Sequence, residues 1–113
     1  MIAEVSEAAL RKRHEQSWLD VMETSLDNLV DLIRSARKTK SAISIGYHGN
    51  IVEVWRRMVE VYEKTGELLI DLASDQTSLH APFTGGYYPY QLSYNEANVI
   101  PRCMKLCYLI AHN

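Results

Sequence analysis

The residues best equipped for chemistry gather in one irregular stretch, residues 73–90, which is rich in glycine, proline and tyrosine. Within it, Asp75, Ser78 and His80 are the three residue types of a nucleophilic triad. A nucleophilic serine usually sits on a strained G-x-S-x-G elbow, and this stretch has no such pattern. Asp75 also suits an Asx turn. We therefore predict a ligand-binding loop, because a long loop in a compact domain is usually functional and this one is too aromatic for disorder.

Four more residues are candidates for ligand contact, two beside the predicted elements and two within the loop. Glu4 follows a short apolar segment, and an acid at a strand end in a dinucleotide-binding fold holds the ribose hydroxyls. The alternative for a lone acid is a charge at a helix start. Asn50 precedes a predicted helix as a favoured N-cap, and the positive end of that helix would suit an anion such as pyrophosphate. Gly85 and Gly86 let the backbone approach a ligand closely, or simply turn the chain.

Metal-ligating residue types are present without the paired spacing of a zinc site. Cys103 and Cys107 stand four positions apart, which is typical of packing on one helix face. His48, His80 and His112 are scattered along the chain. We therefore predict no metal site. Two cysteines are too few for a disulfide framework, so we expect a reducing, cytoplasmic setting.

The elements that must position these residues alternate between strands and helices. Apolar runs and apolar residues at spacings of three and four predict strand, helix, strand, helix and strand over residues 2–5, 18–36, 42–45, 51–62 and 68–72. Crossovers of this length make the strands parallel neighbours, so the fold class is α/β, half of a doubly wound sheet. Ligands of such sheets bind beyond the carboxyl ends of the strands, where the candidate residues stand.

Polar residues and glycines mark the boundaries between these elements. Ser17 with Asp20 resembles a capping box that starts the first long helix, and Ser93 with Glu96 resembles one that starts a last short helix. Residues 46–50, bracketed by glycines, are predicted to form a turn.

Composition excludes several classes of protein. The chain has 113 residues, of which 47% are hydrophobic and 23% charged, so neither disorder nor a collagen-like repeat is expected. A formal net charge of −2 argues against binding to nucleic acid. No apolar run approaches the roughly 20 residues of a membrane span, and the first residues lack the basic region of a secretory signal. We therefore expect no nucleic-acid or membrane partner.

The long loop also carries a resemblance to a known family. Its sequence DQTSLH at 75–80, followed by PF at 82–83 and GGYYP at 85–89, resembles the urocanases (urocanate hydratases), particularly their eukaryotic-like branch. Upstream, SIGYHGN at 44–50 is similar to the same family, in the same order. The resemblance covers residues 1–98.

The resemblance implies a partial Rossmann-like NAD-binding domain with a long ligand-binding loop. Urocanases hydrate urocanate to imidazolonepropionate in histidine catabolism, with tightly bound NAD+ as an electrophile rather than a hydride acceptor. Carried over by position, no catalytic residue falls in this chain, and Glu4 would face the adenosine ribose. The other cofactor-binding positions would be Asn50, Ile51, Gln76, Thr77, Ser78, Leu79, His80, Tyr87 and Tyr88.

The chain also departs from the family. The glycine-rich phosphate loop, the substrate-binding region and the segment with the family's active-site cysteine have no counterpart here, and Cys103 and Cys107 do not stand in that cysteine's context. Ala81 and Thr84 replace residues that are commonly polar in the family. We expect residues 99–113 to be a divergent tail, as a truncated or frameshifted gene, or genuine divergence, would produce.

Two functional hypotheses follow from the sequence. The first is a fragment of urocanate hydratase that is inactive by itself, whose full-length form would take a small-molecule substrate, urocanate, and form a homodimer. The second is a non-catalytic module that keeps NAD binding or interacts with another chain. NAD+ binding abolished by Gln76→Ala or Asn50→Ala would indicate a retained site.

Overall fold

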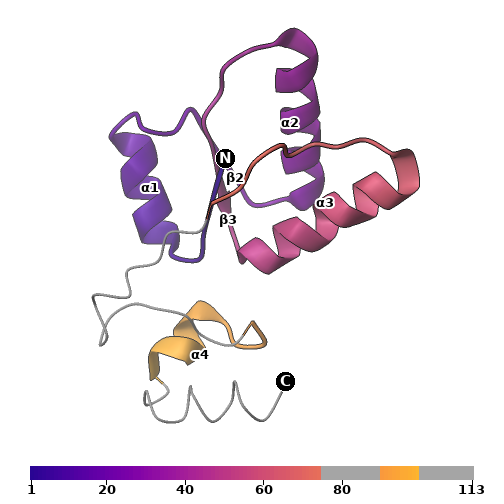
Figure 1. Ribbon diagram of the computed structural model, residues 1–113. Coiled ribbons are helices and arrows are strands. Elements are labelled where there is room, and N and C mark those ends of the chain that lie inside the picture. Colours follow the sequence, from indigo (N-terminus) through magenta and orange to yellow (C-terminus); the bar gives the residue numbers. More distant parts are fainter. Residues whose placement is uncertain (75–89, 100–113) are drawn as a thin grey trace. The chain divides into compact units, whose positions relative to one another are not determined.

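The computed structural model describes residues 1–74 and 90–99 and divides the chain into two units, Met1–Leu72 and Ala73–Asn113. The first unit alternates strands and helices in the order β1 (Ile2–Glu4), α1 (Glu7–Glu15), β2 (Val21–Glu23), α2 (Leu26–Thr39), β3 (Ile45–His48) and α3 (Ile51–Thr65) (Figure 1). The described part of the second unit holds one short helix, α4 (Tyr94–Val99).

The three strands form a parallel sheet in the order β1-β3-β2, so β3 is the central strand. In register, Ile2 lies opposite Gly46, and Val21 lies opposite Ile45. Helix α1 lies on one side of the strands and helices α2 and α3 lie on the other (Figure 1). Helices on both faces of a parallel sheet define the doubly wound arrangement, so the predicted α/β class is confirmed.

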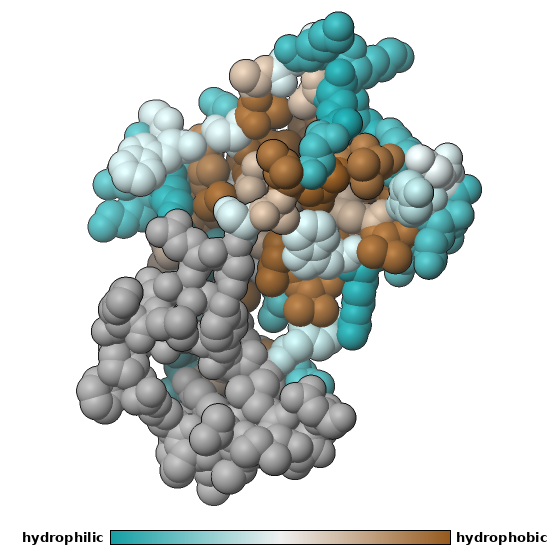
Figure 2. Space-filling view, viewed as in Figure 1, coloured by the Kyte–Doolittle hydropathy of each residue, from teal (hydrophilic) through white to brown (hydrophobic). Residues whose placement is uncertain are grey.

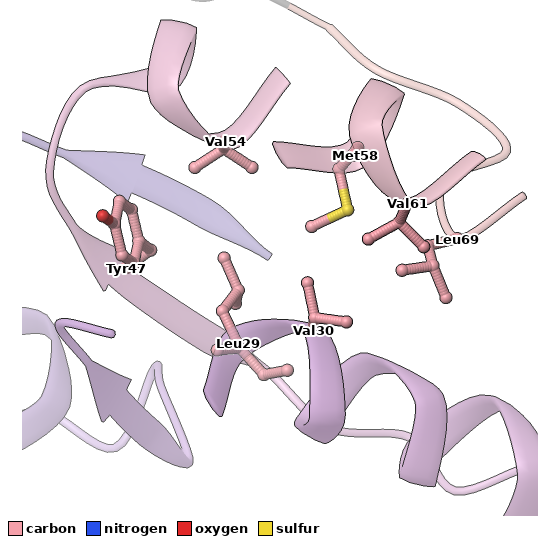
Figure 3. Close-up of a cluster of buried hydrophobic side chains, with 8 residues drawn as sticks. Leu29, Val30, Tyr47, Val54, Met58, Val61 and Leu69 are labelled. Atoms are coloured by element: carbon pink, nitrogen blue, oxygen red, sulfur yellow. The ribbon is translucent and has the colours of Figure 1, made fainter. Parts of the chain in front are cut away.

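The main core lies between β3 and the helices α2 and α3. Side chains alternate between the two faces of a strand, and Ile45 and Tyr47 both point into this core. Figure 3 shows Tyr47 at one end of the cluster, which continues with buried side chains from α2 and α3. These are Leu29, Val30, Val54, Met58 and Val61, joined by Leu69. Full burial of one such side chain contributes roughly 1.5–3 kcal/mol.

The opposite face of β3 has no side chain at its centre. A Cβ on Gly46 would lie 2.6 Å from Leu19 Cδ1 and 2.7 Å from Leu10 Cδ1. Both leucines are buried, and Leu10 belongs to α1. Glycine in mid-strand therefore lets α1 and the loop after it approach the sheet closely.

The long helices have well-defined ends. Helix α2 starts at the N-cap Ser25, whose hydroxyl accepts a hydrogen bond from the Asn28 backbone N–H at 3.4 Å. Helix α3 starts at the N-cap Asn50 and ends at Gly66, which adopts a left-handed conformation with φ of 70°. Capping at both ends satisfies backbone groups that a helix leaves unpaired. The predicted helix over 51–62 is confirmed and extends by three residues.

The prediction for residues 18–36 is wrong at its start. A strand, β2, occupies Val21–Glu23, and the helix begins only at Leu26. Ser17 is no N-cap: it has φ of 59°, and the Asp20 carboxylate instead accepts hydrogen bonds from the Ser44 N–H and hydroxyl, both at 2.7 Å. A three-residue strand next to a helix leaves apolar spacings that imitate one continuous helix, so periodicity alone missed it.

Two strand predictions also need correction. The strand predicted at 42–45 is β3, which lies at Ile45–His48. Gly46 to His48 therefore belong to the sheet and not to a turn. Residues 68–72 form no strand. Leu69 instead fills the core beside α2, while Arg37 donates to the Leu69 carbonyl at 3.4 Å and pairs with Asp71 at 2.5 Å.

In the second unit, the predicted capping box is confirmed. The Ser93 N–H and hydroxyl both donate to the Glu96 carboxylate, and the Glu96 N–H donates to the Ser93 hydroxyl at 3.3 Å. These bonds hold the pKa of Glu96 below its usual value. Across the residues that the structure describes, no helix has the length and apolar character needed to cross a membrane.

Candidate functional site

The carboxyl ends of the three parallel strands meet along one edge of the sheet, which we call the carboxyl edge. Glu4, at the end of β1, lies opposite His48, at the end of β3, and Glu23, at the end of β2, lies opposite Tyr47. Past the strand end, the Gly49 N–H donates to the Glu4 carbonyl at 3.1 Å. The end of β1 and the start of α3 are therefore adjacent.

Glu4 has a defined carboxylate at this edge. One oxygen accepts a hydrogen bond from the Ser6 N–H at 3.0 Å, and the other accepts from Arg13 Nη1 at 2.9 Å. Ser6 is the N-cap of α1, so Glu4 does place its charge at the start of a helix, which was the alternative considered for it. It is compatible with a ligand role as well. An ionised carboxylate has about four acceptor sites, and two remain on a side chain that is 23% exposed.

The start of α3 is the second feature of the carboxyl edge. The Asn50 amide oxygen accepts a hydrogen bond from the Val52 N–H at 2.9 Å, so the predicted N-cap is confirmed. The Asn50 carbonyl accepts from the Glu53 N–H at 3.1 Å. Ile51 is the first residue of the helix and is exposed. The positive end of a 15-residue helix thus opens beside Glu4.

Tyr47 fixes the short loop between β3 and α3. Its ring is buried and occupies the place where a side chain at residue 49 would project, which accounts for glycine at that position. Burial raises the pKa of the Tyr47 hydroxyl, and the negative charge of Glu53 raises it further. The buried tyrosine ring therefore packs directly against the backbone at Gly49, between the strand end and the start of α3.

Glu23 and His48 complete the described part of the carboxyl edge. Sequence reasoning missed Glu23 because it missed β2. The Glu23 carboxylate accepts hydrogen bonds from the Ser25 N–H at 2.9 Å and the Thr24 N–H at 2.8 Å, and these hold its pKa below the usual value. His48 places Nε2 3.3 Å from the Val5 carbonyl. Both side chains are engaged in shaping the loops at this edge.

The remaining predicted binding residues lie outside the described part of the chain. These are Gln76, Thr77, Ser78, Leu79, His80, Tyr87 and Tyr88. Asp75, Cys103 and Cys107 lie outside it as well. Among residues 1–74 and 90–99, no three His, Cys, Asp or Glu residues cluster in a way that could hold a metal ion.

The described residues of the carboxyl edge offer two complementary groups. Glu4 presents acceptors for hydroxyl donors, and the start of α3 presents a positive end to an anion. A nucleotide carries both a ribose diol and phosphates, so its chemistry fits this donor and acceptor set. Glu4, Asn50 and Ile51 are brought to one edge of the sheet as the sequence predicted.

Comparison with known proteins agrees with this arrangement. A family model described as the urocanase Rossmann-like domain matches residues 1–105. Urocanate hydratase of Mus musculus is 58% identical over 97 residues, and that of Homo sapiens is 57% identical over the same length; each match covers 86% of this chain. A probable urocanate hydratase of Caenorhabditis elegans is 50% identical over 98 residues, which are 87% of this chain. The chain spans about 14% of the length of each of these relatives.

Proposed function

Since the chain belongs to the urocanase family, with a Rossmann-like domain, we propose that it serves the hydration of urocanate to imidazolonepropionate as part of an NAD-binding site. The position of the carboxyl edge supports this proposal. In doubly wound sheets the dinucleotide lies beyond the carboxyl ends of the strands. The observation that carries it is the adjacency of Glu4 to the start of α3, fixed by the Gly49 hydrogen bond.

The acceptor groups of Glu4 at this edge fit NAD+ better than NADP+, which carries an additional 2′-phosphate. The free acceptor positions of Glu4 suit the two hydroxyls of the adenosine ribose. A 2′-phosphate in that place would meet a carboxylate, and like charges repel. Arg13 is held at 2.9 Å from Glu4, so its charge is directed to the carboxylate. We therefore propose that the edge prefers NAD+ over NADP+.

The start of α3 would hold the anionic part of the cofactor. Asn50 and Ile51 present the positive helix end, and the rigid Tyr47 ring keeps the preceding loop in place. The residues from Gln76 to His80, with Tyr87 and Tyr88, are proposed to line the cofactor on the basis of the family resemblance. When bound, NAD+ supplies an electrophilic nicotinamide ring for the reaction.

Calorimetric titration with NAD+ tests the binding proposal. We expect one site per chain, with affinity reduced about tenfold or more by Glu4→Gln, because one charge-assisted hydrogen bond contributes roughly 1.5–3 kcal/mol. Gln76→Ala is expected to weaken binding as well. Leu72→Ser, a change at a residue that is 92% exposed, is the matched control and should bind as the native chain does. Absence of NAD+ binding by the native chain would contradict the proposal.

Turnover is a separate measurement. We propose that the chain alone binds the cofactor without hydrating urocanate, because it spans about 14% of the length of the curated urocanate hydratases that it matches. The loss of urocanate absorbance in the presence of NAD+ follows the reaction. An unchanged absorbance is the expected result, and sustained loss that depends on the chain would refute this part of the proposal.

A further inference from the structure

An ion pair joins helix α1 to the end of strand β1. Arg13 Nη1 lies 2.9 Å from Glu4 Oε2, although the two residues are nine positions apart in the sequence. Arg13 stands in the last turn of α1, and because helix side chains lean toward the N-terminus, its guanidinium reaches back toward the helix start. The other Glu4 oxygen accepts from the Ser6 N–H at 3.0 Å. The Glu4 carboxylate therefore lies between two donors that α1 and its N-cap supply.

The Glu4 carboxylate is in effect an anion bound by its own chain. A guanidinium and a backbone N–H are also donors that proteins use for phosphate oxygens. In the proposed cofactor site, the 2′-hydroxyl of the adenosine ribose meets Glu4, and the 2′-phosphate of NADP+ would stand at the same place. Arg13 can therefore serve one of two anions, the carboxylate that it holds in this structure or a 2′-phosphate.

The ion pair is open to solvent on a helix that is itself firmly anchored. The side chain of Arg13 is 39% exposed and that of Glu4 is 23% exposed. Figure 2 shows hydrophilic surface at the left of the first unit, where α1 lies in Figure 1. Leu10, one turn before Arg13 on the same side of α1, is fully buried and anchors the helix to the sheet. A ligand can therefore reach the guanidinium without disturbing the core, once the carboxylate is absent.

We propose that Arg13 is a specificity-determining residue of the cofactor site. Paired with Glu4, it orients the carboxylate and leaves the remaining acceptor positions to the ribose diol of NAD+. Without that carboxylate, the guanidinium receives the 2′-phosphate of NADP+ through charge-assisted hydrogen bonds. This inference rests on the proposed NAD+ site and names the residue that sets its preference between the two cofactors.

Calorimetric titrations with NAD+ and with NADP+ test the role of Arg13. Glu4→Ser removes the carboxylate and keeps a short polar side chain. Its affinity for NADP+ should rise about tenfold or more above that of the native chain, because a charge-assisted hydrogen bond replaces a repulsion. Its affinity for NAD+ should fall about tenfold, so the preference between the cofactors reverses. The gain in NADP+ affinity should shrink as the salt concentration rises.

Variants of two arginines on α1 separate the role of Arg13 from a general effect of charge. Glu4→Ser combined with Arg13→Gln should lose the gain in NADP+ affinity. Arg13→Gln alone should weaken NAD+ binding by about two- to fivefold, because the Glu4 carboxylate loses its partner. Arg11→Gln is the matched control: it removes the same charge from the same helix, but Arg11 pairs with Glu7 and not with Glu4. It should leave both affinities unchanged and preserve the gain of Glu4→Ser, and circular dichroism should show every variant folded.

The outcomes distinguish this inference from the proposed function. If the native chain binds NAD+ but Glu4→Ser gains no affinity for NADP+, the role of Arg13 is refuted and the NAD+ site stands. A gain in NADP+ affinity that survives Arg13→Gln, or that Arg11→Gln abolishes equally, would also overturn the role of Arg13. A native chain that binds no NAD+ would refute the proposed function, and this inference with it.

Discussion

Gly46→Ala is the single change that most directly tests how α1 packs on the sheet. Gly46 lies in the middle of the central strand β3, and the added methyl group would lie 2.6 Å from Leu19 Cδ1 and 2.7 Å from Leu10 Cδ1. Ordinary van der Waals contact begins at 3.4 Å, so each leucine must move by about 0.7–0.8 Å. Both are buried, with Leu10 fully enclosed, so neither can swing into solvent.

The expected cost follows from two opposing effects. Overpacking of a filled core costs about 1–3 kcal/mol, while replacing glycine by alanine within a strand recovers about 0.5–1 kcal/mol of backbone entropy. The free energy of unfolding should therefore fall by about 1–2 kcal/mol. For a domain of this size that corresponds to a decrease in Tm of roughly 5–15 °C. Urea unfolding followed by circular dichroism measures the change.

A double-mutant cycle identifies the cause. Leu10→Ala removes one of the two obstructing side chains, so its cost should be about 1 kcal/mol or more smaller in the Gly46→Ala background than in the native chain. Gly66→Ala is the matched control: no atom lies within 4 Å of the place its new methyl group would take, so its cost comes from its positive φ and should add to that of Leu10→Ala. A Gly46→Ala protein as stable as the native one, or strict additivity with Leu10→Ala, would refute the packing account.

Three further predictions concern the loops and the core. The pKa of Asp20 lies below its ordinary 3.8 because the Ser44 backbone N–H and hydroxyl donate hydrogen bonds to the Asp20 carboxylate. The stability that the ionised Asp20 contributes is therefore fully present above pH 3.8 and is lost as the pH falls through the lowered pKa. Asp20→Asn should therefore flatten the acid limb of stability in urea melts at graded pH, and an unchanged limb would contradict this. Asn50→Ala should lower the unfolding free energy by about 1 kcal/mol by removing the cap on the Val52 N–H; Asn50→Ser should keep most of it, and equal losses would argue against the capping role. Leu29→Ala, at a fully buried position, should cost about 2–5 kcal/mol in urea unfolding, and a cost under 1 kcal/mol would contradict its place in the core.

Sequence reasoning located the helix starts best where a polar cap stood beside a clean apolar pattern. Asn50 and the Ser93–Glu96 box were predicted and confirmed, because a capping side chain acts on backbone groups only two or three residues away. The α/β class was also predicted correctly, since it needs only the alternation of apolar runs and amphipathic stretches.

The errors arose where tertiary contacts override local pattern. The strand β2 is three residues long and exists because it pairs with β3, a partner some 24 positions away in sequence. Residues 68–72 have the apolar composition of a strand, yet Arg34 and Arg37 pair with Glu67 and Asp71 and fasten the segment beside α2. Neither long-range contact leaves a periodic signal in the sequence.

The candidate site was predicted in part for the same reason. Glu4 and Asn50 lie at the carboxyl edge because parallel strands bring their ends together. Glu23 was missed together with its strand, and the role of Gly49 depends on the Tyr47 ring, which is visible only in three dimensions. The residues from Gln76 to His80 stay predictions.

We propose that the carboxyl edge of the sheet binds NAD+. Amide chemical-shift mapping of the ¹⁵N-labelled chain during titration with NAD+ tests it most directly. We predict that the largest chemical-shift changes fall on the amides of Gly49, Asn50 and Ile51. The Ser6 amide, which donates to the Glu4 carboxylate, should shift as well. The amides of Ala42 and Ile43, at the amino end of the sheet, should not change. Shifts confined to the amino end, or none at saturating NAD+, would contradict the claim.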